Sequence, residues 1–270
     1  MVNKMELKVM TFNLRVFVPQ DGENAWPYRV DKVSKMILDH SPLIVGTQEG
    51  ALFMLEGLEK RLPAYRWTGK GRRGGMEDEF CAIFYRYDEL EIVDEGQFWL
   101  SETPEEPGSI SWNSDFPRIC TWTHFRVKKS GQEFIHYNTH LDHISQEARE
   151  NGIQLIWERI SKHYEEKKLP IILTGDFNSK PDNQVVQFLR GEIASSKAML
   201  KDSYSVLEGD IGRTYHHEFS GGTSGEPIDY IFTTPNVEIV KTVVDRRKIE
   251  EAFPSDHYPV VSTLLIENKY

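Results

Sequence analysis

Residues 171–181 of the chain read IILTGDFNSKP, an apolar run that passes directly into polar residues. The run Ile171–Thr174 predicts a fully buried β-strand that ends at Asp176, because short, continuous apolar runs are typical of strands covered on both faces. Asp176 and Asn178 follow at the strand end, where loops converge and functional sites are commonly built. This stretch therefore predicts a buried sheet whose strand end carries polar chemistry.

The same pattern, a short apolar strand that ends in a polar cluster, recurs along the chain. Further strands are expected at residues 7–14, 43–47, 80–87, 91–100, 121–128, 133–139, 228–233, 237–244 and 258–266. Residues 129–131 have the turn chemistry to join two of them as a hairpin. Helices are expected at residues 27–40, 51–61 and 146–164. Many strands with few helices favour stacked sheets flanked by helices over an alternating strand–helix fold.

The bulk properties predict one domain spanning residues 1–270, because no linker or internal repeat divides the chain. Cys81 and Cys120 lie in apolar stretches, which favours two free thiols in a reducing cytoplasm over a disulfide. Residues 1–10 lack the apolar run of a signal peptide, and no segment is apolar enough to span a membrane. A cytoplasmic protein with no membrane contact and no obligate protein partner is expected.

The formal net charge of -10 argues against a broad, sequence-independent nucleic-acid surface, because such binding depends on Lys and Arg neutralising phosphates. The compact basic cluster in the glycine-rich stretch KGRRGG contains Lys70, Arg72 and Arg73, and we expect these to be mobile, solvated charges. The charge balance favours a small or single-stranded substrate over long duplex DNA.

Carboxylate, amide and imidazole side chains gather at the predicted strand ends. The clusters are Asn13 with Arg15, Gln48 with Glu49, His140 with Asp142 and His143, Asp176 with Asn178, Asp229, and Asp256 with His257. Taken singly, each is also an ordinary turn former or strand cap. Together, their carboxylates would repel one another in a cleft unless a cation were bound there. Oxygen ligands of this kind suit Mg²⁺ or Mn²⁺, and no zinc-site spacing is present.

Six motifs in this order, TFNLR, TQEG, NTHLDH, TGDFNSKP, IDYIF and SDHYPV, resemble those of the endonuclease/exonuclease/phosphatase superfamily, which includes deoxyribonuclease I. The stretches GQFWLSETP and PRICTWTHF look like a bacterial branch near its deadenylase-like members. The resemblance spans nearly the whole chain. It implies an α/β fold: a four-layer α/β/β/α sandwich with two packed, mixed β-sheets and a divalent-metal site at one edge.

The resemblance also implies roles for individual residues. Glu49 matches the main metal ligand, and Asn13 and Asp256 match residues that help to hold the metal. Asp176 matches the aspartate that orients or deprotonates the attacking water.

Five further matches concern the phosphate and the residues around it. Asn178 and His140 match groups that contact phosphate oxygens. His257 matches the histidine beside the scissile phosphate, and Asp229 matches the carboxylate that orients it. Glu79 is a looser match to a carboxylate partner of His140.

Other residues are candidates for supporting or substrate-binding roles. Asp142 is expected either to tether backbone near the site or to take part in catalysis. Arg118 is expected to approach substrate phosphate, as an arginine does in related nucleases. Trp26 and Arg29, at a helix start near the first cluster, are candidate substrate contacts, with Trp26 as a stacking platform for a base or sugar.

The leading hypothesis is a Mg²⁺- or Mn²⁺-dependent phosphoesterase, of the phosphodiesterase or nuclease type, that hydrolyses single-stranded nucleic-acid ends or small phosphate esters. One alternative is a phosphomonoesterase that acts on sugar or inositol phosphates. A catalytically inactive binding module is less expected, because the catalytic motifs are intact. A lipid-directed sphingomyelinase would need an apolar protruding hairpin and usually a secretion signal, and neither is evident in the sequence.

Overall fold

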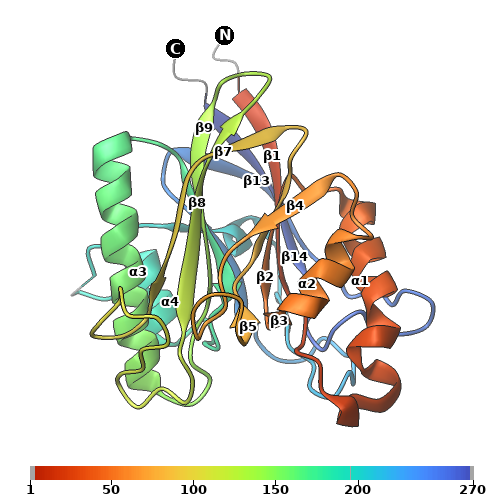
Figure 1. Cartoon of the computed structure of the whole chain (residues 1–270). Helices are drawn as coiled ribbons and strands as arrows, with labels where there is room; N and C mark the ends of the chain where they lie inside the picture. The colour runs from red at the N-terminus through yellow and green to blue at the C-terminus, as the bar shows by residue number, and fades with distance from the viewer. Residues whose placement is uncertain (1–3, 195, 268–270) are drawn as a thin grey trace.

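Two six-stranded sheets pack face to face in a computed structural model that describes residues 4–194 and 196–267 (Figure 1). The first sheet has the strand order β13-β14-β1-β2-β6-β4. Its strands are β13 Val237–Val244, β14 Val260–Glu267, β1 Lys4–Asn13, β2 Ile44–Gln48, β6 Ile83–Arg86 and β4 Tyr65–Thr68. The second has the order β11-β12-β10-β9-β8-β7. Its strands are β11 Lys201–Asp202, β12 Asp229–Thr233, β10 Ile171–Asp176, β9 Glu133–His140, β8 Ile119–Val127 and β7 Leu90–Trp99. Both sheets are mixed, because β1–β2 and β9–β10 pair in parallel while their neighbours are antiparallel.

Helices cover the outer face of each sheet, which confirms the expected four-layer α/β/β/α sandwich (Figure 1). Helices α1 Trp26–His40 and α2 Leu52–Glu59 lie on the first sheet, and α3 Gln146–Lys167 and α4 Gln184–Arg190 on the second. Short elements complete the chain: β3 Gly50–Ala51, β5 Glu79–Phe80, η1 Pro19–Asn24 and η2 Ser203–Val206.

The long helices follow from local sequence signals. In α1, Pro27 occupies the first turn, and Val30, Val33 and Ile37 form a buried stripe at helical spacing. In α3, the Ser145 side chain caps the N-terminus by accepting a hydrogen bond from the Ala148 backbone N–H.

Two differences from the predicted elements have simple physical causes. The strand expected at residues 80–87 is divided into β5 and β6, because β5 leaves the sheet to pair with β3, while β6 pairs with β2. Helix α4 and strand β4 were not predicted, since each is too short to show a clear period.

Strand alternation decides which side chains reach the space between the sheets. In β1, Met10 and Phe12 pack in the cluster that contains the α1 and α2 residues, whereas Leu7 and Val9 pack in the cluster between the sheets. Because successive side chains point to opposite faces, the residue at the end of β1, Asn13, is directed between the sheets as well.

A layer of polar side chains joins the sheets beneath the strand ends. Gln48 Nε2 donates hydrogen bonds to Asn138 Oδ1 at 2.7 Å and to Thr11 Oγ1 at 3.2 Å. Thr174 Oγ1 lies 3.0 Å from both Asn138 Oδ1 and His136 Nε2. All five residues are fully buried, so this network fixes the position of one sheet relative to the other.

The network requires glycine at position 46 in β2. A Cβ atom there would lie 2.2 Å from Thr174 Oγ1 and 2.6 Å from Asn138 Oδ1. Gly46→Ala is therefore expected to lower the free energy of unfolding by about 1–3 kcal/mol, because the sheets would have to separate. Urea unfolding measures this change. Gly57→Ala in α2 is the matched control, since a Cβ there meets nothing within 4 Å and should leave stability unchanged or raised. Equal midpoints for Gly46→Ala and the wild type would contradict the close approach of the sheets.

Cys81 and Cys120 are free and buried, as expected from the sequence. Among the described residues, none of the helices combines the length and the apolar character that crossing a membrane requires.

Candidate active site

A cleft of about 380 Å³ lies where strands of both sheets end. Most of the residues predicted from the sequence line it: Glu49, Glu79, Arg118, His140, Asp176, Asn178, Asp256 and His257. Asn13 and Asp229 lie directly behind them, within hydrogen-bonding distance of this group. The motifs that are far apart in the sequence therefore meet in one place.

Sheet register brings the second sheet's contribution together. Asp176, the last residue of β10, pairs across the ladder with His140 of β9 on one side and with Asp229 of β12 on the other. The first sheet contributes Asn13 and, just beyond β2, Glu49. Each sheet thus carries part of the cluster, and the polar layer below sets the distance between the two parts.

Glu49 is held in its place by two donors. Its carboxylate accepts hydrogen bonds from Asn13 Nδ2 at 2.9 Å and from the Val16 backbone N–H at 2.8 Å. Burial opposes ionisation of this side chain, but the charge of His257 and these two hydrogen bonds outweigh burial and lower the pKa of Glu49. Glu49 is therefore a carboxylate at neutral pH.

Asp176 is fixed in a similar way but in a less favourable electrostatic environment. Its Oδ1 accepts the Asn178 backbone N–H at 2.9 Å, and its Oδ2 accepts Asn13 Nδ2 at 3.0 Å. Burial and the negative charge of Asp229 raise the pKa of Asp176 to about 7. Burial also raises the pKa of Asp256. Buried carboxylates with raised pKa values indicate a concentration of negative charge that the protein's own cations compensate only in part.

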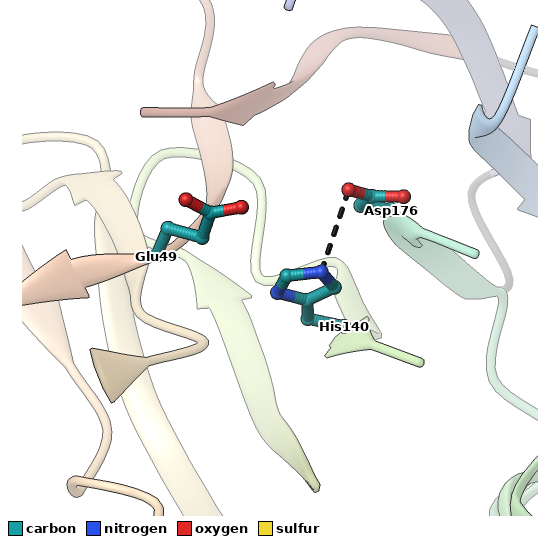
Figure 2. Close-up of side chains that lie close together, drawn as sticks. All are labelled: Glu49, His140 and Asp176. Atoms are coloured by element: carbon teal, nitrogen blue, oxygen red, sulfur yellow. Dashed lines mark ion pairs between the residues drawn. The ribbon is translucent and has the colours of Figure 1, made fainter. Parts of the chain in front are cut away.

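This cluster fits a divalent cation. Figure 2 shows Glu49, His140 and Asp176 directed toward one another, and their ligand atoms all lie within 4.8 Å of one another. The neighbouring carboxylates raise the oxygen content of the donor set, which suits Mg²⁺ or Mn²⁺. Asn13 is less suited to be a direct ligand than its sequence match implies. Its amide nitrogen faces the two carboxylates, and its oxygen already accepts the Arg15 backbone N–H at 2.9 Å.

His257 lines the cleft and forms a buried pair with Asp229, which lies behind it. Nδ1 of His257 lies 2.9 Å from Asp229 Oδ2, and its Nε2 lies 3.8 Å from Asp176 Oδ2. Burial disfavours the imidazolium, but the charge and hydrogen bond of Asp229, with the charges of Asp176 and Asp256, outweigh it and raise the pKa of His257 to about 10. His257 is therefore a protonated donor whose Nε2–H faces the cleft.

His140 is the neutral histidine of the site. Burial, followed by the charge of Arg118, holds its pKa well below the usual value. Its Nε2 lies 3.1 Å from Asn178 Nδ2 and 3.4 Å from Asp176 Oδ2, so the contact with Asp176 is polar rather than a charged pair. Asn178 also donates to the Leu141 carbonyl at 3.0 Å, which fixes its amide against the end of β9.

Asp142 tethers the loop that follows β9. Its Oδ1 accepts the backbone N–H groups of Ile144 and Ser145 at 3.0 and 2.7 Å. Its Oδ2 accepts the Ser114 hydroxyl at 3.0 Å and lies 3.4 Å from Arg118 Nε. These contacts favour the backbone-tethering alternative over a catalytic role for Asp142.

Glu79 does not pair with His140 in the structure. Its Oε1 lies 3.0 Å from Arg72 Nη2, and no hydrogen bond joins Glu79 to His140 in the described part of the chain. Burial and the charge of Glu49 raise the pKa of Glu79 to about 7. The expected Glu79–His140 contact is thus replaced by an ion pair that the sequence did not suggest.

Trp26 and Arg29 require a correction, because neither lines the cleft. Trp26, the first residue of α1, is buried in the core between that helix and the first sheet. The Arg29 guanidinium donates to the Leu14 and Pro254 carbonyls, both at 2.8 Å, and to the Arg15 carbonyl at 3.0 Å. Arg29 therefore ties the loop after β1 to the loop before β14, and its donors are directed at backbone rather than at a substrate.

Several residues that line the cleft were given no individual role from the sequence, although Arg15 and His143 belong to the predicted strand-end clusters. These are Arg15, Arg72, Phe116, His143, Tyr215 and Ile228. Arg72 is buried and paired with Asp78 and Glu79, so the expectation of a mobile, solvated charge was wrong for it, whereas Arg73 is half exposed. Tyr215 packs against His257 with ring centroids 4.8 Å apart. Tyr215 directly precedes two histidines in the sequence, His216 and His217, which was a weak signal that could have drawn attention to it.

Comparisons with known proteins match this chain to one family and to several of its members. The model of the endonuclease/exonuclease/phosphatase family matches residues 10–257. An RNA exonuclease of Saccharomyces cerevisiae is 25% identical over 179 residues, which are 55% of this chain and 49% of that protein. The chain spans about half the length of the curated relatives that it matches first.

Two bacterial structures match over nearly their whole length. A family protein from Bacteroides thetaiotaomicron is 34% identical with a TM-score of 0.90, covering 99% of this chain and 100% of that one. A mannosyl-6-phosphatase from the same organism is 36% identical with a TM-score of 0.88, covering 96% of this chain and 99% of that one.

Proposed function

Because this chain belongs to the endonuclease/exonuclease/phosphatase family, we propose that it is a divalent-metal-dependent phosphoesterase that hydrolyses a small phosphate ester. The supporting observation is the buried cluster of Glu49, Asp176 and His257, which places carboxylates and a protonated donor in one cleft of about 380 Å³. That volume is at the lower end of the range for small-molecule sites, which favours a compact ester over an extended polymer.

Glu49 is proposed to hold the cation, with His140 and Asp176 within reach and Asp256 nearby. A bound Mg²⁺ or Mn²⁺ supplies positive charge that neutralises the phosphate oxygens and stabilises the leaving oxygen. Asn13 keeps the Glu49 and Asp176 carboxylates at a fixed separation through its two hydrogen bonds. Because these carboxylates are already in position, less free energy is needed to reorient them when the substrate binds.

Asp176 is proposed to align the attacking water and to accept its proton, because a raised pKa makes a carboxylate a better base near neutral pH. Nε2–H of His257 is then directed at a non-bridging phosphate oxygen, and Asp229 keeps that imidazole charged and oriented. Asn178 adds an oriented amide to the same region. Hydrolysis would transfer the phosphoryl group to water and leave the alcohol of the ester as product.

Two classes of substrate are supported by the comparisons. A phosphomonoester is supported by the 36% identity to the mannosyl-6-phosphatase, which extends over nearly both chains. Cleavage of single-stranded nucleic-acid ends is supported by the match to an RNA exonuclease, at lower identity and over half of that protein. We further propose that residues 1–270 act as one domain, and the cytoplasmic location stays a prediction.

Metal removal gives the direct test. The purified protein is expected to hydrolyse phosphate esters with Mg²⁺ or Mn²⁺ and to lose about a thousandfold or more of that rate in excess chelator, since a bound metal supplies several kcal/mol of transition-state stabilisation. Phosphate release from a panel of monoesters, diesters and oligonucleotides measures it. Readdition of metal should restore the rate. Full turnover in chelator would contradict the proposal, and so would the lack of activity on every ester with either metal.

A further inference from the structure

One side of the cleft is lined by residues that the proposed hydrolysis does not use. We refer to Arg72, Glu79, Phe116 and Arg118 as the arginine wall. The wall comes from two separate segments: residues 72–79, which lead into β5, and residues 116–118, which precede β8. It adjoins the catalytic cluster, because Glu49 and His140 share a small recess with Arg72, Glu79 and Arg118. A group esterified to a bound phosphate would therefore lie within reach of the wall.

The wall is held rigidly. The Arg72 guanidinium lies 4.5 Å from the centroid of the Phe116 ring, and that of Arg118 lies 6.0 Å from it. The side chains of Arg72 and Arg118 are only 9% and 6% exposed. Nε1 of Trp99 also donates to the Arg72 carbonyl at 2.6 Å, which fixes the backbone of the first segment. Polar atoms held in this way have fixed directions, which a specificity site requires.

The positive charges of the wall are already paired with carboxylates. Arg72 lies 3.0 Å from Asp78 Oδ1 and 3.0 Å from Glu79 Oε1, and Arg118 lies 3.4 Å from Asp142 Oδ2. Two guanidinium groups thus face three carboxylates. A second phosphate on the substrate would need positive charge that is not already paired. The wall therefore does not favour a bisphosphate or an extended nucleic-acid backbone.

The wall nevertheless offers a free donor and a free acceptor within the same cleft. Arg118 uses Nε toward Asp142 and Nη2 toward His143, and its Nη1 makes no hydrogen bond within the described part of the chain. In residues 4–194 and 196–267, nothing donates a hydrogen bond to the second carboxylate oxygen of Glu79, whose side chain is 17% exposed. A hydroxyl group both donates and accepts, so adjacent hydroxyls match this combination better than any charged group does.

We propose that the arginine wall binds the hydroxyl groups of a sugar, so that the substrate is a monosaccharide phosphate. This inference rests on the proposed phosphoesterase function and names its substrate class. Arg118 Nη1 donates to one hydroxyl and Glu79 accepts from its neighbour, while the Phe116 ring keeps both arginines in place as a positioning residue. The cleft volume of about 380 Å³ accommodates a single ring with its phosphate.

The first experiment uses the wild-type protein with Mg²⁺ and compares kcat/KM for glucose, mannose and fructose 6-phosphates with that for phenyl phosphate, which lacks hydroxyls. The best hexose phosphate is expected to exceed phenyl phosphate by at least about tenfold, and its monodeoxy analogues should lose about tenfold where the wall binds the missing hydroxyl. A short oligonucleotide and a dialkyl phosphate are included in the same assay.

The second experiment measures the ratio of kcat/KM for the best hexose phosphate to that for phenyl phosphate in Arg118→Lys. Lysine keeps the charge but loses the planar fork, so this ratio should fall about tenfold or more, chiefly through the KM of the sugar phosphate. Arg73→Lys is the matched control, because Arg73 lies beside Arg72 but is 53% exposed and does not line the cleft. It should leave the ratio unchanged.

The outcomes separate the two proposals. Hydrolysis of phenyl phosphate without any preference for sugar phosphates would overturn the inference about the wall and leave the phosphoesterase function standing. Preference for the oligonucleotide or the diester would also overturn the inference. An equal loss on both substrates in Arg118→Lys would show that Arg118 acts on the phosphate rather than on hydroxyls. Failure to hydrolyse any ester would overturn the proposed function itself.

Discussion

Replacing Glu49 by glutamine is expected to lower the metal-dependent kcat/KM by about a thousandfold or more. Glutamine keeps the shape of the side chain and can still accept a hydrogen bond from Asn13 or Val16. It removes the ionised carboxylate proposed to hold the cation, and about 4 kcal/mol of lost transition-state stabilisation corresponds to a thousandfold in rate. Kinetics at increasing Mg²⁺ and Mn²⁺ concentrations, together with calorimetric titration of the metal, would measure the change.

The control for this substitution is Glu165→Gln, an exposed position near the C-terminal end of α3 that does not line the cleft. It should match the wild type in both metal affinity and rate. Thermal unfolding of the metal-free proteins would show whether Glu49→Gln still folds. A folded Glu49→Gln variant that binds metal with wild-type affinity and turns over normally would refute the assignment of Glu49.

Asp229→Asn is expected to lower kcat by roughly 10²–10⁴-fold, with a smaller change in KM, because the substitution acts on the transition state. Asparagine keeps the size of the side chain but removes the charge that holds His257 protonated. Without that charge, burial lowers the pKa of His257, so the remaining activity should disappear at lower pH than in the wild type. Rate profiles between pH 5 and 10, recorded on one substrate, measure both effects. Asp94→Asn, at an exposed position in β7, is the control.

The same pair has a consequence for stability in the metal-free protein. The folded-state pKa of His257, about 10, is above the ordinary value of about 6.5 expected in the unfolded chain. The stabilisation is therefore fully present below pH 6.5 and is lost as the pH rises through 10. Urea unfolding in chelator should show this decrease in the wild type and a weaker one in Asp229→Asn. Parallel pH dependence in the two proteins would mean that Asp229 does not set the charge of His257.

The sequence was sufficient to predict the fold class and to identify most of the residues that line the cleft, because strand ends and family motifs coincide. Asp176 and His140 could be placed together since each terminates a strand, and alternation then directs both between the sheets. The same reasoning failed for Arg29. Proximity to a motif in the sequence does not show where a long side chain points, and Arg29 points to the backbone carbonyls of two loops.

Glu79 and Arg118 were predicted site residues, but their association with Arg72 and Phe116 could not be predicted, because it depends on tertiary contacts between separate segments. Arg72 was interpreted as a solvated charge from its glycine-rich surroundings, yet Trp99 and Phe116, distant in sequence, hold it in the cleft. No local period or motif encodes such a contact. The polar layer between the sheets was also not foreseen, since Asn138 and Gln48 are buried polar residues whose partners lie on the opposite sheet.

The neighbours of β1 in the first sheet have a consequence for how the protein is made. β1 lies between β2 and β14, so it pairs with a strand that is synthesised long after it. Synthesis proceeds from the N-terminus, and until β14 emerges one side of β1 is an open edge that can pair with other chains. Asp256 and His257 lie shortly before β14 and are therefore synthesised just before it. A nascent chain that already carries Glu49 and Asp176 but not yet Asp256 and His257 therefore has no assembled catalyst.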